Sequence, residues 1–302
     1  MLSEEHAHGT TPIQALPGRR GALIVQERAV IAGYGTRVLR APGTGPTAVL
    51  LHGFGDSADT WSQVLGRLAH EGRAAVALDM PGFARADALR PEPVLPQLVT
   101  FARAAATRFA ERGQGSVLVG NSLGGAAALL AGQGTGPPLR RIVAIAPAGF
   151  DMARWIYRLE TFSLLQASLQ VPGVPLGVLH GIVARIYREM AIYDQRAVDR
   201  HVVQTFVGHY LDRRTAIRYL RVARRMRPEL STSFVLDDVR VPVEVIWGRQ
   251  DRMLDVNGAE KVQEAIPHAH VEILEECGHC PQVECADETA ALLLDALAAA
   301  EG

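Results

Sequence analysis

Lysine is nearly absent from this 302-residue sequence: of its 31 basic residues all but Lys261 are arginine. Basic and acidic residues almost cancel, so the net charge of −1 provides no general attraction to nucleic acid or to an anionic membrane. No run reaches the ~18 consecutive apolar residues of a membrane span, and we expect no stable membrane insertion. The start, MLSEEHAHG, carries acidic groups where a signal peptide carries basic ones, which predicts a cytoplasmic protein.

Cysteine is also scarce, and the three cysteines, Cys277, Cys280 and Cys285, lie within nine positions. An odd number at such short spacing does not suit a disulfide framework. A structural zinc site normally uses two distant pairs of ligands, and only one Cys-x-x-Cys is present here. We therefore predict reduced thiols, no metal and no other cofactor; Cys277 and Cys280 would flank His279 and could make its function sensitive to thiol chemistry.

The hydrophobic content of 48% suits a globular protein with one large core. Residues 1–20 are polar and rich in proline and glycine, which predicts a flexible tail. Beyond them, apolar runs alternate with helical patterns and predict a doubly wound, mostly parallel α/β sheet. The runs expected to form its buried strands are 47–51, 74–79, 116–120, 141–145, 241–247 and 270–274.

The alternation stops between residues 150 and 231, where several helices are expected. We interpret this segment as a helical cap inserted into a core made of residues 21–149 and 232–302. The cap is rich in aromatic residues, and Trp155, Phe162 and Phe206 are candidates for the walls of a substrate pocket.

One expected cap helix carries Arg214, Arg218, Arg221 and Arg225 on a single face. We favour the interpretation that this is a solvated helix face, because runs of charge usually are. Attraction of an anionic substrate or of a negatively charged surface is the alternative.

The stretch VLVGNSLGG at 117–125 joins an apolar strand to a helix of small residues through a Gly-x-Ser-x-Gly turn. Gly120 and Gly124 lack the Cβ atoms that would collide in a tight strand-to-helix corner, so Ser122 can occupy a strained, exposed position. This pattern predicts a nucleophile elbow, with the amides of the following helix directed at the same place.

A serine hydroxyl is a weak nucleophile and needs a base, usually a histidine held by a carboxylate. Asp251 follows one late strand and His279 follows the next, so the order Ser122, Asp251, His279 matches a known triad order. Asp255 and Asp151 compete with Asp251 for the acid position.

With these motifs the chain resembles the α/β-hydrolase family, in its compact form with a cap, over residues 22 to 300. LHGFG at 51–55 is similar to the family's oxyanion loop, LDMPGF at 78–83 to its Asp-x-x-Gly segment, and GHCPQVE at 278–284 to the stretch that carries the family histidine. The resemblance implies that the backbone N–H groups of Phe54 and Leu123 form an oxyanion hole. We expect His52 to shape this turn and Asp79 to cap its own turn.

These residues predict a serine hydrolase that cleaves a carboxylic ester of a moderately apolar small molecule. A thioesterase or lactonase would use the same groups. The first alternative is a carbon–carbon bond hydrolase of a vinylogous diketone acid, because GNSLGG at 120–125 is similar to the elbow of those enzymes, although GFGDS at 53–57 lacks their Ser-Gly-Pro-Gly loop. An alternative of another class is a ligand-binding or receptor protein with slow turnover. The oligomeric state and the physiological substrate stay open.

Overall fold

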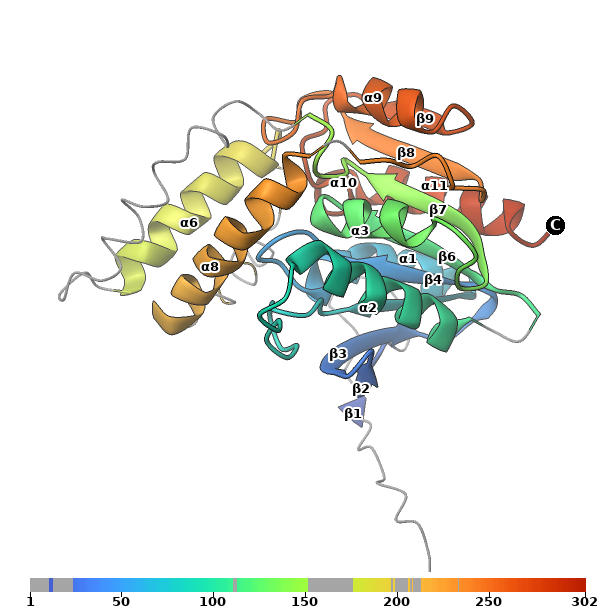
Figure 1. Ribbon diagram of the computed structural model, residues 1–302, viewed down its shortest axis with the longest axis horizontal. Helices are drawn as coiled ribbons and strands as arrows, with labels where there is room; N and C mark the ends of the chain where they lie inside the picture. The colour runs from blue at the N-terminus through green and yellow to red at the C-terminus, as the bar shows by residue number, and fades with distance from the viewer. Residues whose placement is uncertain are drawn as a thin grey trace, which may run out of the picture.

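A nine-stranded sheet forms the centre of the molecule in a computed structural model that describes residues 11–12, 24–110, 113–151, 176–196, 198, 206, 208, 213–232 and 234–302 (Figure 1). The strand order is β1-β2-β3-β5-β4-β6-β7-β8-β9. The first strands pair antiparallel up to the β3–β5 pair, and every pair from β5–β4 to β8–β9 is parallel. The strands are β1 (Thr11–Pro12), β2 (Val25–Ile31), β3 (Tyr34–Ala41), β4 (Thr44–Leu51), β5 (Arg73–Leu78), β6 (Ser116–Asn121), β7 (Leu139–Ile145), β8 (Val243–Gly248) and β9 (His270–Leu274).

Helices cover both faces of this sheet (Figure 1). Apolar residues of α2, α3, α8 and α9 form one core cluster, and those of α1 and α11 form the cluster on the opposite face. The helices are η1 (Ala58–Trp61), α1 (Ser62–His70), α2 (Val94–Phe109), α3 (Leu123–Ala131), α6 (Leu176–Ala191), α8 (Arg213–Leu230), α9 (Gly258–Ala265), α10 (Pro281–Glu284) and α11 (Ala286–Ala299). No described helix has the length and apolar character needed to cross a membrane.

The central strands are apolar along their whole length because helices pack on both faces of them. In β4, every residue from Gly45 to Leu51 is buried, and β6 is buried throughout. Side chains of a strand alternate between its faces, so Leu51 enters one core cluster while Leu50 enters the other. The predicted doubly wound α/β fold is confirmed.

Several element boundaries differ from those predicted. Within the expected flexible tail, Thr11–Pro12 pairs with β2. Strand β8 begins at Val243 rather than at residue 241. A 3-10 turn, η1, precedes α1, and the Ser57 hydroxyl accepts the Asp59 N–H at its start. The short helix α10 ends before α11 begins, because Cys285 between them has a ψ of 49°, which is not helical.

The described part of the cap consists mainly of α6 and α8, which stand together beside the sheet (Figure 1). Apolar residues of α8 are buried against the core, among them Tyr219, Val222 and Met226. The helix thereby covers the end of the sheet at which β4 and β6 terminate.

Candidate active site

Ser122 follows β6 directly and has the positive φ predicted for a nucleophile elbow, with φ 55° and ψ −114°. A non-glycine residue in such a conformation costs about 1–3 kcal/mol and persists only where its surroundings enforce it. Its backbone is held on both sides, because its N–H donates to Ile145 O at 2.8 Å and its carbonyl accepts Ala148 N–H at 3.0 Å.

The two glycines of the elbow are required by close backbone approach. A Cβ on Gly120 would lie 2.2 Å from the Gly124 carbonyl carbon, and one on Gly124 would lie 2.4 Å from Leu51 O. A side chain at either position would push α3 away from β6 or β4. The small residues in the sequence therefore set the angle at which Ser122 leaves the sheet.

The loop after β4 lies against Ser122. A Cβ built on Gly53 would be 3.3 Å from Ser122 Cβ, which places the peptide of Phe54 next to the serine. Leu123 is the first residue of α3, so its N–H has no acceptor within the helix. The two backbone amides predicted as oxyanion donors thus lie on the two segments that meet at Ser122.

His52 shapes this loop through both ring nitrogens. Its Nε2 accepts Met80 N–H at 2.8 Å, so Nδ1 carries the proton and donates to Gly53 O at 2.7 Å. The ring is completely buried. With both nitrogens engaged in this way, His52 holds the Gly53 peptide in place.

His279 and Asp251 form a buried pair at the ends of β9 and β8. His279 Nδ1 lies 2.7 Å from Asp251 Oδ2, and the two side chains are 5% and 0% exposed. The other carboxylate oxygen, Oδ1, accepts Met253 N–H at 2.8 Å and Leu254 N–H at 2.9 Å. These bonds orient the carboxylate, and the Nδ1 contact leaves Nε2 as the ring nitrogen that can accept a proton.

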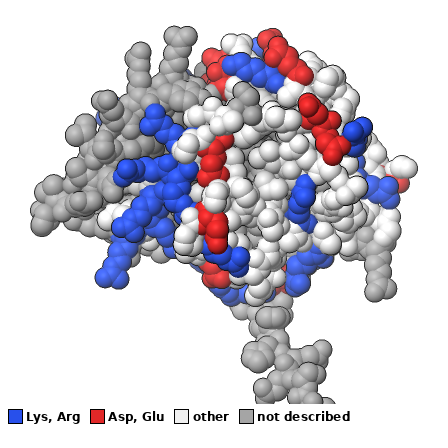
Figure 2. Space-filling view, in the orientation of Figure 1, with Lys and Arg blue, Asp and Glu red and all other residues white. Residues whose placement is uncertain are grey.

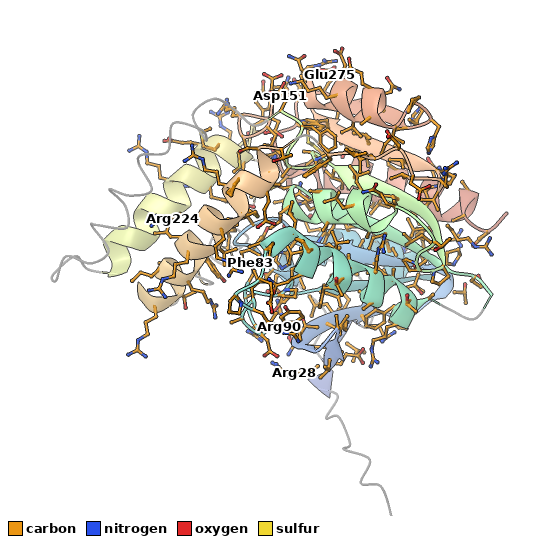
Figure 3. The ribbon with its side chains drawn as sticks, in the orientation of Figure 1. Arg28, Phe83, Arg90, Asp151, Arg224 and Glu275 are labelled. Carbon is orange, nitrogen blue, oxygen red and sulfur yellow. A yellow bond between two sulfur atoms is a disulfide. The ribbon has the colours of Figure 1, made fainter. Side chains whose placement is uncertain are left out.

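The competing acids lie elsewhere. Asp255 is exposed and accepts Asn257 N–H, while Asp151 Oδ2 pairs with Lys261 Nζ at 2.6 Å. Asp151 is labelled beside α9, at the outer side of the sheet, in Figure 3. Of the three candidate acids, Asp251 is the one whose carboxylate lies against the His279 ring.

Buried hydrogen bonds of two side-chain amides, which the sequence did not reveal, connect the elbow to the loop that carries His279. Asn121 Nδ2 donates to His279 O at 3.0 Å, and Asn121 Oδ1 accepts Gln282 Nε2 at 3.2 Å. Gln282 also reaches Thr60 Oγ1 at 3.3 Å. The residue before the serine therefore holds the backbone of the histidine, an arrangement that only folding makes visible.

Residues 48–292 match the alpha/beta hydrolase family. The chain belongs to this family. Monoacylglycerol lipase ABHD6 from Bos taurus is 28% identical over 268 residues, covering 85% of this chain and 77% of that protein. The 2-hydroxy-6-oxononadienedioate/2-hydroxy-6-oxononatrienedioate hydrolase from Paraburkholderia phymatum is 25% identical over 277 residues, covering 83% of this chain and 86% of that protein.

Solved structures agree on the fold. That of 2-hydroxy-6-oxo-6-phenylhexa-2,4-dienoate hydrolase from a Rhodococcus species superimposes with a TM-score of 0.73 at 21% identity, covering 91% of this chain and 99% of that one. A membrane phospholipase A gives a TM-score of 0.71 at 23% identity, covering 92% and 86%. The α/β-hydrolase resemblance is confirmed at the level of family and fold.

In this hydrolase three aromatic rings pack together between the loop after β4 and helix α8. Phe54 packs edge-on against Phe83, and both contact Tyr219 of α8, with ring centroids 5.2–6.3 Å apart. Figure 3 shows Phe83 where the core meets α8. Of these rings only Phe54 was predicted at the site, and for its N–H alone.

The predicted pocket residues have different outcomes. Trp155 and Phe162 lie outside the described residues. Phe206 is buried and stacks on Tyr187 at 4.0 Å between ring centroids. Phe206 also shares a small apolar cluster with Cys280, so it packs beside the residue that follows His279.

The prediction of three reduced thiols is wrong for two of them, because Cys277 and Cys285 form a disulfide. Although the two cysteines are only eight positions apart, the turn of α10 brings them together, with Cα atoms 6.4 Å apart. Cys280 remains a buried free thiol. Burial raises the pKa of the Cys280 thiol well above its usual value, which disfavours the reactive thiolate.

Two buried carboxylates flank the oxyanion loop. Asp79 accepts Arg85 N–H at 3.1 Å across its own turn, where a capping role was predicted. It also accepts Ala58 N–H at 2.8 Å and pairs with Arg37, so it ties β5 to the start of η1. Asp56 differs, because desolvation raises its pKa to about 7, against the hydrogen bond from Ser57 N–H. The nearby charges of Asp59 and Asp79 raise the pKa of Asp56 further.

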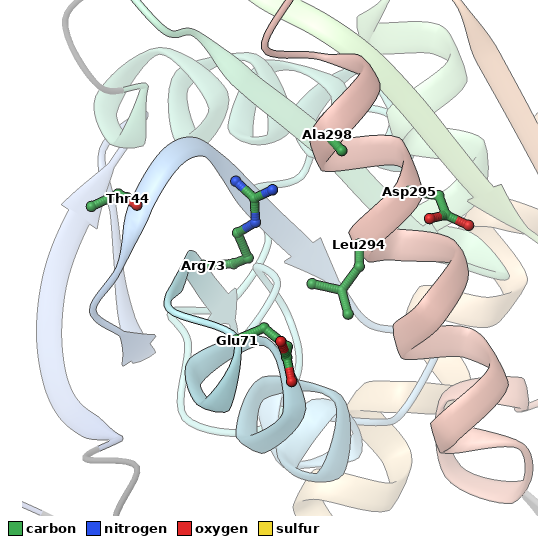
Figure 4. Close-up of a pocket in the computed structure, with 6 residues that line it drawn as sticks. All are labelled: Thr44, Glu71, Arg73, Leu294, Asp295 and Ala298. Atoms are coloured by element: carbon green, nitrogen blue, oxygen red, sulfur yellow. The ribbon is translucent and has the colours of Figure 1, made fainter.

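A surface depression of about 480 Å³ lies at the opposite edge of the sheet (Figure 4). It is lined by Thr44, Glu71, Arg73, Leu294, Asp295 and Ala298. Thr44 and Arg73 begin β4 and β5, whereas Ser122 follows the carboxyl end of β6. The depression therefore has no part in chemistry at Ser122.

Proposed function

We propose that this hydrolase cleaves a carboxylic ester of a moderately apolar small molecule through an acyl-enzyme on Ser122, with His279 as base and Asp251 as its orienting acid. The observation that carries the proposal is the meeting of three features at one edge of the sheet. These are the positive φ of Ser122, the buried His279–Asp251 pair and the Gly53–Phe54 turn against the serine.

In the proposed reaction, Ser122 Oγ attacks the ester carbonyl while His279 Nε2 takes the hydroxyl proton. The carbonyl oxygen becomes an oxyanion that the Phe54 and Leu123 amides hold; loss of one such donor typically costs ~3 kcal/mol of transition-state stabilisation. The carbon–oxygen bond breaks and His279 returns the proton to the leaving alkoxide, which departs as the alcohol. Water, deprotonated by His279, then attacks the acyl group and releases the carboxylic acid and Ser122.

The apolar character of the site supports an ester with a hydrocarbon part. Phe54 is half-buried and packs on the buried rings of Phe83 and Tyr219, so aromatic side chains lie beside the proposed oxyanion hole. Relatives named monoacylglycerol lipase agree with this choice.

Carbon–carbon bond cleavage is the second candidate. Its support is the similarity to 2-hydroxy-6-oxononadienedioate hydrolases and the resemblance of GNSLGG at 120–125 to the elbow of carbon–carbon bond hydrolases. Such a substrate carries carboxylates, so the two candidates differ in the charge that the site must accept.

Covalent labelling tests the proposal most directly. A fluorophosphonate probe should modify Ser122, located by peptide mass spectrometry, and p-nitrophenyl esters of graded acyl length should be hydrolysed. Ser122→Ala and His279→Ala should lower kcat by a factor on the order of 10⁴ or more, because the members of such a triad act as a unit.

Asp251→Asn should reduce kcat steeply as well, while Asp255→Asn serves as the matched control and should retain wild-type turnover. The absence of an adduct on Ser122 in folded protein would contradict the serine mechanism and favour a ligand-binding role. Turnover of a 2-hydroxy-6-oxo-dienoate with no esterase activity would select the carbon–carbon candidate.

A further inference from the structure

The C-terminal end of the cap helix α6 lies directly against the loop that carries His279. The N–H of His279 donates to the carbonyl of Ala191, the last residue of α6, at 2.9 Å. Tyr187 and Ala191 of this helix pack in one apolar cluster with Cys280 and Val283. The cap thus contacts the backbone of the proposed base itself.

A single carboxylate joins the same two segments a second time. Glu284 Oε2 accepts the Gly278 N–H at 3.1 Å, and Oε1 accepts the Asp194 N–H at 2.7 Å. The Tyr193 N–H lies 3.0 Å from both oxygens. Glu284 therefore bridges Gly278, the residue before His279, and the turn after α6. This bridge is strong, because hydrogen bonds from amides to an ionised carboxylate are stronger than those between neutral groups.

Gly278 permits this close approach. A Cβ on Gly278 would lie 2.7 Å from Ala191 O and 2.9 Å from Tyr193 N, and 2.9 Å from the Glu284 carboxylate. The backbone of the turn after α6 is therefore in direct contact with the peptide that precedes His279. Movement of one segment must displace the other or break the Glu284 bonds.

The acid loop is attached to the same helix. Arg252, next to Asp251, donates from Nη1 to Glu189 O near the end of α6 at 3.1 Å. The end of α6 consequently touches the loops of both members of the His279–Asp251 pair.

We propose that Glu284 is a positioning residue that couples the end of α6 to the backbone of His279. Through this coupling, the position of the cap determines how the His279 imidazole is oriented toward Ser122. This inference rests on the proposed function, in which His279 is the base. Glu284 does not take part in the chemical steps. Its effect is on the rate of proton transfer rather than on substrate affinity.

Glu284→Gln is the informative variant, because it keeps the side-chain length but replaces an acceptor oxygen with an NH₂ group that faces backbone N–H groups. Misplacing a catalytic group by about 1 Å costs up to about 100-fold, so we expect kcat and the rate of fluorophosphonate labelling of Ser122 to fall by about tenfold or more. KM should change by less than about threefold, since no substrate contact is removed. Glu288→Gln, on the exposed first turn of α11, is the matched control and should behave as wild type.

Hydrogen–deuterium exchange provides a readout that does not depend on activity. In Glu284→Gln the amides of Gly278, Tyr193 and Asp194 should exchange faster than in wild type, with little change elsewhere. Labelling and kcat of the folded variant within about twofold of wild type would overturn the inference. If wild type itself is not labelled on Ser122, the proposed function fails instead, and unchanged exchange at these three amides would then overturn the Glu284 bridge as well.

Discussion

At the scale of single residues, the loop predicted to carry the oxyanion donor Phe54 depends on how its buried polar groups are neutralised. His52 uses both ring nitrogens and Asp79 pairs with the Arg37 guanidinium. Among the described residues no basic side chain forms an ion pair with Asp56, and burial is the main cause that raises its pKa. The loop that carries the Phe54 amide therefore contains one carboxyl group whose charge opposes folding.

The pH dependence of stability follows from the sign of that shift. The Asp56 pKa rises from 3.8 to about 7 on folding, so between these values the folded chain binds more protons than the unfolded chain. The contribution of Asp56 is most favourable below the unfolded pKa and is lost as the pH rises toward 7. Asp56→Asn should remove this slope and raise the free energy of unfolding at pH 8 by on the order of 1–3 kcal/mol.

Urea unfolding of wild type and Asp56→Asn at pH 5 and pH 8 measures this difference. Asp237→Asn, at an exposed carboxylate, is the control and should leave the slope unchanged. An Asp56→Asn protein less stable than wild type at pH 8 would show that Asp56 is charged and stabilising there.

At the scale of elements, the disulfide Cys277–Cys285 closes the segment from the end of β9 to the start of α11, with His279 inside the loop. A cross-link over so short a loop stabilises by about 2–3 kcal/mol through the unfolded chain. Cys285→Ser should lower the free energy of unfolding by that amount and leave the Ser122 labelling rate nearly intact, since Glu284 still holds Gly278.

Reduction by dithiothreitol should lower the thermal midpoint of wild type and have no effect on Cys285→Ser. Equal sensitivity of both proteins to the reductant would contradict the assignment of the disulfide.

Basic side chains gather over the arginine-rich helix α8 on the face shown in Figure 2. Arg214 and Arg221 are exposed, as predicted for a solvated face. Arg225 instead donates to Arg90 O at 2.6 Å, so it fastens the loop before α2. The predicted solvated arginine face of α8 therefore also contains an arginine that holds a neighbouring loop.

Substitutions on α8 should separate its exposed face from its buried one. Arg221→Ala should change the free energy of unfolding by less than about 0.5 kcal/mol. Tyr219→Phe should cost about 1–2 kcal/mol, because the Tyr219 hydroxyl accepts the Ala84 N–H at 2.9 Å and its loss leaves that amide without an acceptor. Chemical denaturation of both variants measures these values. Equal losses of unfolding free energy in Arg221→Ala and Tyr219→Phe would contradict the burial of Tyr219.

At the scale of the whole molecule, the parallel strands gather distant residues at one edge. His52 follows β4, Asp79 follows β5, Ser122 follows β6, Asp251 lies beyond β8 and His279 beyond β9. The carboxyl ends of parallel strands point the same way, so residues up to 227 positions apart in sequence, as counted from His52 to His279, meet there. The cellular location of the protein stays a prediction.

The alternation of strands and helices and the position of the elbow can be predicted from the amino-acid sequence, because apolar period and glycine placement are local properties. The sequence also placed Asp251 and His279 after successive strands, which is enough to propose the pair. The choice between Asp251, Asp255 and Asp151 required the folded chain, since all three lie near strand ends and they differ in their distance to the His279 ring. The same holds for the Cys277–Cys285 disulfide and for Glu284 and Asn121, whose partners come from other elements and leave no periodic signal in the chain.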